Sequence, residues 1–416
     1  MLQASLQLYK NAYSGIPKPI WWLSFVILIN RSGTMVIPFL TVYLVHKGFT
    51  ITDAGLIMAA FGVGAIIGGF IGGKLTDSIG PFLVQVASLF LNGILFIVLG
   101  YMQELWQFAL CIFVLSSLGE AFRPANSAAI AAYSDEQNRT RSYSLNRLAV
   151  NLGWAIGPAT GGLLASINYS LLFWVDGITC IVAAFLLYFL LPPQKTIVQK
   201  FEHHPKDRPK SSAYKDGIYL KAMACMLLVS FCFFQLFSII PVFYKQDVHL
   251  SEAAIGWVLA SNGLIIALVE MVLVYKLENR QTSMIYMVWG AFLIGLALLL
   301  LSVSPIIALV VCSMLVITFG EMFLFPFANT FWVSRTNDLN RGQYAAIYTM
   351  TFALAQVLSP LISAPIALKW GYPTLFILDF AFCCLAAFGF LWLHKQLANV
   401  GAIQTGSTGT LVRPGS

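Results

Sequence analysis

The sequence predicts an all-α membrane protein whose twelve transmembrane helices form two pseudo-symmetric six-helix bundles. Of its 416 residues, 59% are hydrophobic and 10% are charged, whereas a soluble globular domain carries about 25% charged residues. Twelve apolar stretches of about 20 residues follow one another, and each is long enough to cross the hydrocarbon core as a helix. The second half of the chain also repeats the first, and this repeat predicts the two bundles.

The twelve predicted helices are separated by short polar connections, with one longer polar segment in the middle of the chain. They span 20–45, 52–74, 82–102, 105–132, 142–166, 170–191, 222–244, 251–275, 283–303, 305–333, 344–368 and 374–397. We therefore expect an N-terminal bundle over 1–191, a cytoplasmic linker over 192–221, a C-terminal bundle over 222–397 and a tail over 398–416. The last twelve residues of the tail, TGSTGTLVRPGS, are typical of a cloning remnant.

Positive residues outside the apolar stretches are unevenly distributed between the two sides of the membrane. Seventeen Lys and Arg lie on the side of the termini and linker, and three, Lys47, Lys245 and Lys369, lie on the other side. Because positive connections stay in the cytoplasm, we expect a multi-pass protein of the cell (inner) membrane with both termini cytoplasmic. The same bias explains the net charge of +7, so nucleic acid is not an expected partner.

The internal repeat has an offset of 201 to 203 residues. LLFWVD ends at Asp176 and TLFILD at Asp379, LGEAF and FGEMF place Glu120 opposite Glu321, and Pro158 matches Pro360. Two parallel six-helix repeats joined by a polar linker are typical of secondary transporters. The matching positions of the two aspartates predict a shared structural role for them, as a helix cap or an interhelical hydrogen bond.

The connection between the second and third predicted helices reads GGKLTDSIG, from Gly72 to Gly80. It resembles the G-x-x-x-D-R-x-G-R-R loop signature of the major facilitator superfamily at Gly73, Asp77 and Gly80, although Ser78 replaces the usual Arg and the basic pair is missing. The resemblance implies a latch, in which Gly73 lets helices approach closely and the Asp77 carboxylate caps a helix across the interface of the two halves. A plain turn with a solvated aspartate is the alternative.

The fifth predicted helix carries NLGWAIGPATGGLL. This segment matches the superfamily's antiporter signature, G-x-x-x-G-P-x-x-G-G, at every defined position: Gly153, Gly157, Pro158, Gly161 and Gly162. Small residues four apart allow close helix packing, and the proline loosens the backbone. The resemblance implies the bacterial drug/proton antiporter (multidrug efflux) branch, and a generic packing seam is the alternative. The Arg that this branch places earlier on the fourth helix is absent here.

Four charged residues lie midway along predicted helices, where a charge costs at least a few kcal/mol and is a candidate for function. They are Arg31, Glu120, Arg123 and Glu321. In the superfamily, the first, fourth, seventh and tenth helices line a central cavity, so we expect these side chains to meet near the bilayer midplane. Glu120 is expected to stay ionised beside Arg123, unless the two form a merely structural ion pair. Glu321 is the predicted proton carrier.

Further polar and aromatic residues are candidates for the cavity wall. Arg147, Asn151 and Trp154 share one face of the fifth helix at positions i, i+4 and i+7, although a packing role fits them equally well. Asn329 on the tenth helix completes the candidate set. No nucleotide-binding loop, metal-ligand spacing or nucleophile elbow appears, so we expect no cofactor, no metal and no enzymatic activity.

Together, these patterns predict a proton-coupled secondary transporter that exports small amphipathic compounds by alternating access. Its partners would be a small-molecule substrate, protons and the lipid bilayer, and it would act as a monomer. Two alternatives use the same fold: a proton-coupled uptake symporter for a nutrient such as a peptide, and a lipid-handling or sensor membrane protein. The antiporter-type motif favours export, and the charges within the membrane favour transport over sensing.

Overall fold

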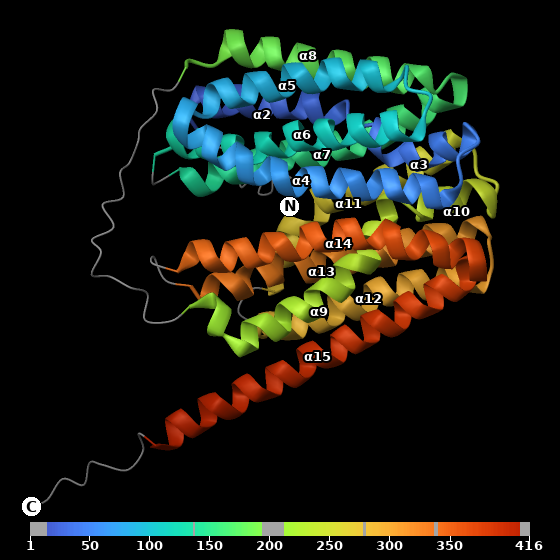
Figure 1. The fold of residues 1–416 in the computed structure, drawn as a ribbon. Helices are drawn as coiled ribbons and strands as arrows, with labels where there is room; N and C mark the ends of the chain where they lie inside the picture. The colour runs from blue at the N-terminus through green and yellow to red at the C-terminus, as the bar shows by residue number, and fades with distance from the viewer. Residues whose placement is uncertain (1–14, 136–137, 194–211, 278–279, 337–339, 408–416) are drawn as a thin grey trace, which may run out of the picture.

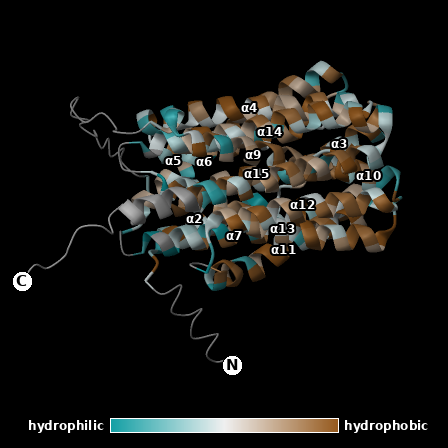
Figure 2. Ribbon diagram, turned by 90° about the horizontal axis from the view of Figure 1, so that it is seen from below, coloured by the Kyte–Doolittle hydropathy of each residue, from teal (hydrophilic) through white to brown (hydrophobic). Residues whose placement is uncertain are grey.

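All twelve predicted membrane helices are present in the computed structural model, which describes residues 15–135, 138–193, 212–277, 280–336 and 340–407 (Figure 1). Most of the linker and the end of the tail lie outside these residues. Throughout the described part, every regular element is an α-helix or a 3-10 helix. Figure 2 shows hydrophobic ribbon along the helices and hydrophilic ribbon gathered towards their ends. The predicted all-α, twelve-helix fold is therefore confirmed.

The first bundle contains the first six membrane spans and forms the upper layer of Figure 1, coloured blue to green. Its helices are α2 (Lys18–Ser32), α3 (Val36–His46), α4 (Ile51–Ile79), α5 (Pro81–Leu99), α6 (Leu105–Tyr133), α7 (Arg139–Ile167) and α8 (Ser170–Leu190). The second bundle forms the lower layer. Its helices are η1 (Ala213–Lys215), α9 (Gly217–Phe233), η2 (Phe234–Phe237), α10 (Ile240–Gln246), α11 (Glu252–Leu277), α12 (Ser283–Val303), α13 (Ile307–Ser334), α14 (Arg341–Trp370) and α15 (Tyr372–Ser407). We call the side where α8 ends and α9 begins the linker face, and the opposite side the far face.

The first and seventh membrane spans are broken, which corrects the continuous helices expected over 20–45 and 222–244. The first span consists of α2 and α3, and the seventh consists of α9, η2 and α10. Each break precedes a proline, Pro38 in α3 or Pro241 in α10. A proline has no N–H to donate to the carbonyl four residues earlier, so helical hydrogen bonding is interrupted there. The two prolines are repeat-equivalent, and both bundles therefore carry the same irregularity.

The two repeat-related aspartates support these breaks. Asp176 of α8 accepts hydrogen bonds through Oδ2 from the backbone amides of Met35, at 3.2 Å, and Val36, at 3.1 Å, so it caps the start of α3. Asp379 of α15 accepts a 2.9 Å hydrogen bond from Gln235 Nε2 in η2. Both carboxylates are buried. The predicted shared role, a cap or an interhelical hydrogen bond, is confirmed, with a backbone cap in one bundle and a side-chain bond in the other.

The two bundles pack through α4 against α14 and through α7 against α11. Small residues make these contacts close, because a Cβ atom added at Gly55 would lie 2.8 Å from the carbonyl oxygen of Pro360. One added at Gly62 would lie 2.7 Å from Cγ2 of Val357. In a membrane, where lipid is as apolar as the side chains, such backbone approach supplies much of the packing energy.

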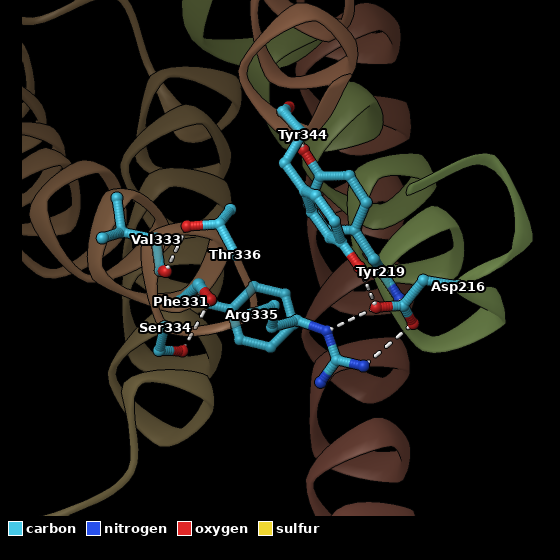
Figure 3. Close-up of polar contacts among 8 residues, drawn as sticks. All are labelled: Asp216, Tyr219, Phe331, Val333, Ser334, Arg335, Thr336 and Tyr344. Carbon is cyan, nitrogen blue, oxygen red and sulfur yellow. Dashed lines mark hydrogen bonds and ion pairs between the residues drawn. The ribbon is translucent and has the colours of Figure 1, made fainter. Parts of the chain in front are cut away.

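A polar cluster ties the linker face of the second bundle together (Figure 3). Arg335, just after α13, donates to both carboxylate oxygens of Asp216 at 2.8 and 2.9 Å, and the Tyr344 hydroxyl donates to the same carboxylate at 2.8 Å. Burial alone would raise the pKa of Asp216, but the hydrogen bonds, first among them those from Arg335, outweigh it and hold the pKa below its ordinary value. Asp216 thereby joins the start of α9 to the adjoining ends of α13 and α14.

Candidate functional site: a charged cavity between the bundles

A cavity of about 240 Å³ lies between the bundles beside both helix breaks. Its walls come from α2, α3, α4, α5, α6, α7 and α8 of the first bundle and from η2 and α14 of the second. One part of the wall is charged, and it consists of Arg31, Glu120, Arg123 and Asp176. Another part is aromatic, and it consists of Phe61, Phe96, Phe122, Trp154, Phe234 and Phe237. A largely apolar pocket with a few polar groups is typical of small-molecule sites.

The charges of the cavity are only partly paired. Glu120 Oε2 and Arg123 Nε lie 3.0 Å apart on the same face of α6, with the side chain of Glu120 23% exposed and that of Arg123 71% exposed. Oδ2 of Asp176 accepts hydrogen bonds from two backbone amides at the start of α3. Among the described residues, Arg31 has no hydrogen-bond or ion-pair partner within 4.0 Å for its guanidinium. The free donor groups of Arg31 and Arg123 are thus available to a ligand.

Glu321 lies outside this cavity, although the sequence suggested that it would meet Arg31, Glu120 and Arg123. Its Oε2 accepts a 3.1 Å hydrogen bond from Asn262 Nδ2, and the same nitrogen lies 3.0 Å from Thr318 Oγ1. The prediction used only the position of Glu321 along its helix. The surface that its side chain meets also depends on which face of α13 packs against α11.

Arg147 also lies outside the cavity, close to the Glu321 cluster. It donates a hydrogen bond to Glu270 of α11 and forms an ion pair with it, and the side chain of Glu270 is 8% exposed. This contact joins the two bundles, because Arg147 belongs to α7.

Neither Asn151 nor Asn329 lines the cavity. Asn329 instead accepts a 2.7 Å hydrogen bond from Trp332 Nε1 on its own helix, whereas Trp154 does line the cavity and contacts Phe237 edge-on.

The glycines of the antiporter-type motif face two different partners. A Cβ atom at Gly153 would lie 2.4 Å from Cβ of Arg31, and one at Gly157 would lie 2.6 Å from the carbonyl oxygen of Thr34. Gly161 similarly meets Met35 at 2.6 Å. Because these three glycines have no side chain, α7 packs closely against the break of the first span. Gly162 faces the other bundle, where the carbonyl oxygen of Glu252 is 2.4 Å from its Cβ position.

Pro158 contributes its carbonyl to the same interface. That oxygen lies 2.3 Å from the Cβ position of Gly256 on α11. The motif is thus a contact surface on both sides of one helix rather than a set of ligands.

The loop motif shows only part of its expected geometry. Gly80 has φ +88°, a left-handed conformation that favours glycine, at the turn between α4 and α5. The expected close helix approach at Gly73 is not found, because no atom lies within 4 Å of its Cβ position; Gly72 makes such an approach instead, to Ala121. Asp77 is exposed and makes no hydrogen bond or ion pair with any described residue.

A polar contact between the bundles on the far face was not predicted from the sequence. Glu252, the first residue of α11, accepts a 2.9 Å hydrogen bond from the Tyr169 hydroxyl of the first bundle. Its Oε1 also lies 2.7 Å from Lys245 Nζ. Each residue stands at the end of a membrane span, where charged and aromatic residues are common. No sequence signal separates them from ordinary interface residues.

Comparison with known proteins agrees with this architecture. Residues 20–360 match the Major Facilitator Superfamily. The chain is 23% identical over 408 residues to a Na(+), Li(+), K(+)/H(+) antiporter of Planococcus maritimus, covering 89% of this chain and 96% of that protein. It is also 23% identical over 286 residues to the quinolone resistance protein NorA of Staphylococcus aureus, covering 68% of this chain and 73% of that protein.

Solved structures share the fold at low sequence identity. A peptide transporter POT crystallised with sulfate superposes with a TM-score of 0.77 at 17% identity, covering 92% of this chain and 96% of that one. A bacterial homologue of the human lysosomal transporter Spinster, in an inward-facing and unoccupied conformation, gives 0.72 at 13% identity, covering 90% of this chain and 96% of that one. The superfamily suggested by the loop and helix motifs is confirmed: the chain belongs to the Major Facilitator Superfamily, a family of membrane transporters and not of enzymes.

Proposed function

We propose that this transporter is a proton-coupled antiporter that exports small amphipathic compounds across the cell (inner) membrane by alternating access, acting as a monomer with both termini in the cytoplasm. The observation that carries the proposal is the central cavity, whose wall combines arginine donors without a described partner and aromatic rings beside the breaks of the first and seventh spans. A cavity with these two kinds of wall suits a compound that has both an apolar body and a polar group.

The contacts between the bundles support alternating access with the far face closed in this conformation. Gly162 and Gly256 bring α7 and α11 together near the far face, and Glu252 adds its hydrogen bond to Tyr169. Towards the linker face, the Gly73 region of α4 has open space and Asp77 has no described partner. Rocking the bundles about the cavity would break the first set of contacts and allow the loop motif to form its latch.

Proton coupling needs a carboxylate that gains and loses a proton during the cycle. Glu321 is the proposed carrier, since it has a neutral hydrogen-bond donor, Asn262, and the positive group that acts on it, Arg147, is engaged by Glu270. A rearrangement of α7 against α11 would move Arg147 relative to both carboxylates. Such a change in a charged neighbour alters the proton affinity of a buried acid, and this links helix movement to proton binding.

The named relatives support antiport. The Staphylococcus aureus protein is named for quinolone resistance, which favours export of amphipathic drugs. A second candidate function is antiport of a monovalent cation against protons. It is favoured by the Planococcus maritimus protein, because the similarity to that antiporter extends over nearly the whole of both chains.

The two candidates are separated by one transport assay. Purified protein is reconstituted into liposomes with an acidic interior and an internal pH dye, and a quinolone, an amphipathic dye, or Na⁺, Li⁺ or K⁺ is then added outside. We expect the organic compounds to dissipate the pH gradient. A response to the inorganic cations alone would establish the second candidate, and no response to either would contradict proton-coupled antiport.

The role of Glu321 is tested in the same vesicles with Glu321→Gln, which keeps the shape and removes the titrating group. This variant should bind substrate and exchange substrate for substrate, but it should not respond to the pH gradient. Asp247→Asn is the matched control, because Asp247 is an exposed far-face carboxylate outside the cavity. Gradient-driven transport by Glu321→Gln at the control rate would exclude Glu321 as the carrier.

A further inference from the structure

The central cavity contains a guanidinium that forms no hydrogen bond or close ion pair with any described residue. Of its two acidic residues, Glu120 is paired with Arg123 at 3.0 Å, and Asp176 accepts two backbone amides at the start of α3. Arg31 lines the same cavity and has no described partner within 4.0 Å. A charged group in the membrane interior is costly without a partner. The N–H donors of Arg31 are therefore left for an incoming ligand to bind.

The position of Arg31 is also set by packing rather than by an ion pair. Gly153 of α7 has its Cβ position 2.4 Å from Cβ of Arg31, so the root of the arginine side chain is pressed against helix α7. Its immediate neighbour, Asn30, donates to Cys180 Sγ at 3.3 Å and is engaged elsewhere. The guanidinium thus enters the cavity from a rigidly held backbone, and its planar set of N–H donors can bind a carboxylate, sulfonate or phosphate through two parallel hydrogen bonds.

The aromatic part of the cavity wall determines which kind of molecule can carry the anionic group. Trp154 and Phe237 meet edge to face, with ring centroids 5.5 Å apart, and both line the cavity. Phe61 and Phe96 add aromatic surface from the first bundle. We propose that the cavity selects aromatic compounds that carry an anionic group, as organic anions or zwitterions, with the anion on Arg31 and the ring system on the aromatic wall. This inference rests on the proposed function, since it takes the cavity as the transport site.

The proposal is tested by equilibrium binding in detergent without any ion gradient, so its outcome does not depend on proton coupling. Three fluorescent probes share the dansyl ring system and differ in charge: dansylglycine is an anion, dansylamide is neutral, and dansylcadaverine is a cation. We expect the wild-type protein to bind dansylglycine at least about ten-fold more tightly than dansylamide, the gain typical of a charge-assisted hydrogen bond. Equal affinities, or tightest binding of the cation, would overturn the proposal.

Substitutions locate the anion on Arg31. Arg31→Gln should remove the preference for dansylglycine over dansylamide, and Arg31→Lys should keep part of it, because lysine retains the charge without the fork of donors. Lys369→Gln, which removes a positive charge from an exposed position on the far face, should keep the full preference. An Arg31→Gln variant that keeps the preference for dansylglycine over dansylamide, with both affinities changed by the same factor, would overturn the assignment. If Arg31→Gln does not fold, Arg31→Lys and the wild-type comparison decide.

An anionic lipid would present the same chemistry as a soluble organic anion, so the source is determined by competition. Bound dansylglycine is challenged with a soluble aryl carboxylate and, separately, with short-chain phosphatidylglycerol. Displacement by the carboxylate alone identifies a soluble organic anion, and displacement by the lipid alone identifies a lipid headgroup; either supports an anion site at Arg31. No displacement by either one would contradict the site.

Discussion

Gly162 is the glycine of the α7 motif that contacts the other bundle, and its replacement by alanine should hold the far face apart. The added Cβ would lie 2.4 Å from the carbonyl oxygen of Glu252 and 2.9 Å from Cα of Gly256. Both partners are backbone atoms, which cannot rotate away as a side chain can. Ordinary contact needs 3.4 Å or more, so α7 and α11 must separate by about 1 Å at this point.

The free-energy consequence follows from the cost of overpacking. Inserting a methyl group into a packed contact costs about 1–3 kcal/mol, and the state in which α7 and α11 are apart does not incur this cost. The equilibrium should therefore shift towards the open far face by about 5-fold to about 150-fold. Gly162→Ala should also slow transport, because each cycle must pass through the closed far face.

Distances between spin labels on the far face measure this shift directly. In a cysteine-free background, one label replaces exposed Gln103 in the first bundle and the other replaces exposed Val303 in the second. The longer-distance population should grow in Gly162→Ala. Gly69→Ala is the matched control, because it adds the same methyl group to α4 where no atom lies within 4 Å. Unchanged distances together with full transport in Gly162→Ala would refute the reasoning.

Three further predictions concern the packing of α7, the polar cluster of the linker face and the orientation in the membrane. Gly157→Leu should abolish transport and lower the melting temperature, because its side chain would enter backbone 2.6 Å away at the helix break; full activity and an unchanged melting temperature would show that this contact is incidental. The pKa of Asp216 is depressed in the folded protein, so its stabilising effect is complete above the ordinary aspartate pKa of about 4 and is lost as pH falls below that. Asp216→Asn should therefore reduce stability by about 2 kcal/mol at neutral pH and flatten the acidic limb of a melting-temperature profile, and a wild-type-like limb would contradict this. A cysteine at exposed Tyr214 should react only with reagents added from the cytoplasm, and labelling from outside would reverse the proposed orientation.

The spans were predictable because their signal is local, whereas the breaks within two of them were not. Each span is a run of about 20 apolar residues, and hydrophobicity along such a run is sufficient to identify a membrane helix. The interruption before Pro38 depends on Asp176, which lies 140 residues after Val36 and supplies the cap for α3. A proline near the middle of an apolar run signals a kink, but only the tertiary partner decides whether the helix bends or ends.

The residue types of the site were predictable from the sequence, but which of these residues lie together was not. Arg31, Glu120 and Arg123 meet in one cavity as the sequence suggested, because a charge within a membrane helix must face the protein interior or water. Glu321 obeys the same rule but faces Asn262 on α11. The rule specifies that a charge is turned inward and does not specify which inward surface it meets. That choice is made by the rotation of α13 about its own axis.

The glycine motif of α7 contacts both the cavity wall at Arg31 and the far-face interface with α11. On one side, Gly153 touches the backbone root of Arg31, at the site proposed for the substrate anion; on the other, Gly162 touches α11, at the closure of the far face. Each contact leaves no room for even a methyl group, so a shift of α7 changes both contacts. We therefore expect an anion that binds Arg31 to shift α7, and a shifted α7 would loosen its contact with α11 on the far face. On this proposal, substrate binding and far-face opening are coupled through one helix, and the glycines are required because only they bring α7 close enough to both partners for a small shift to change both contacts.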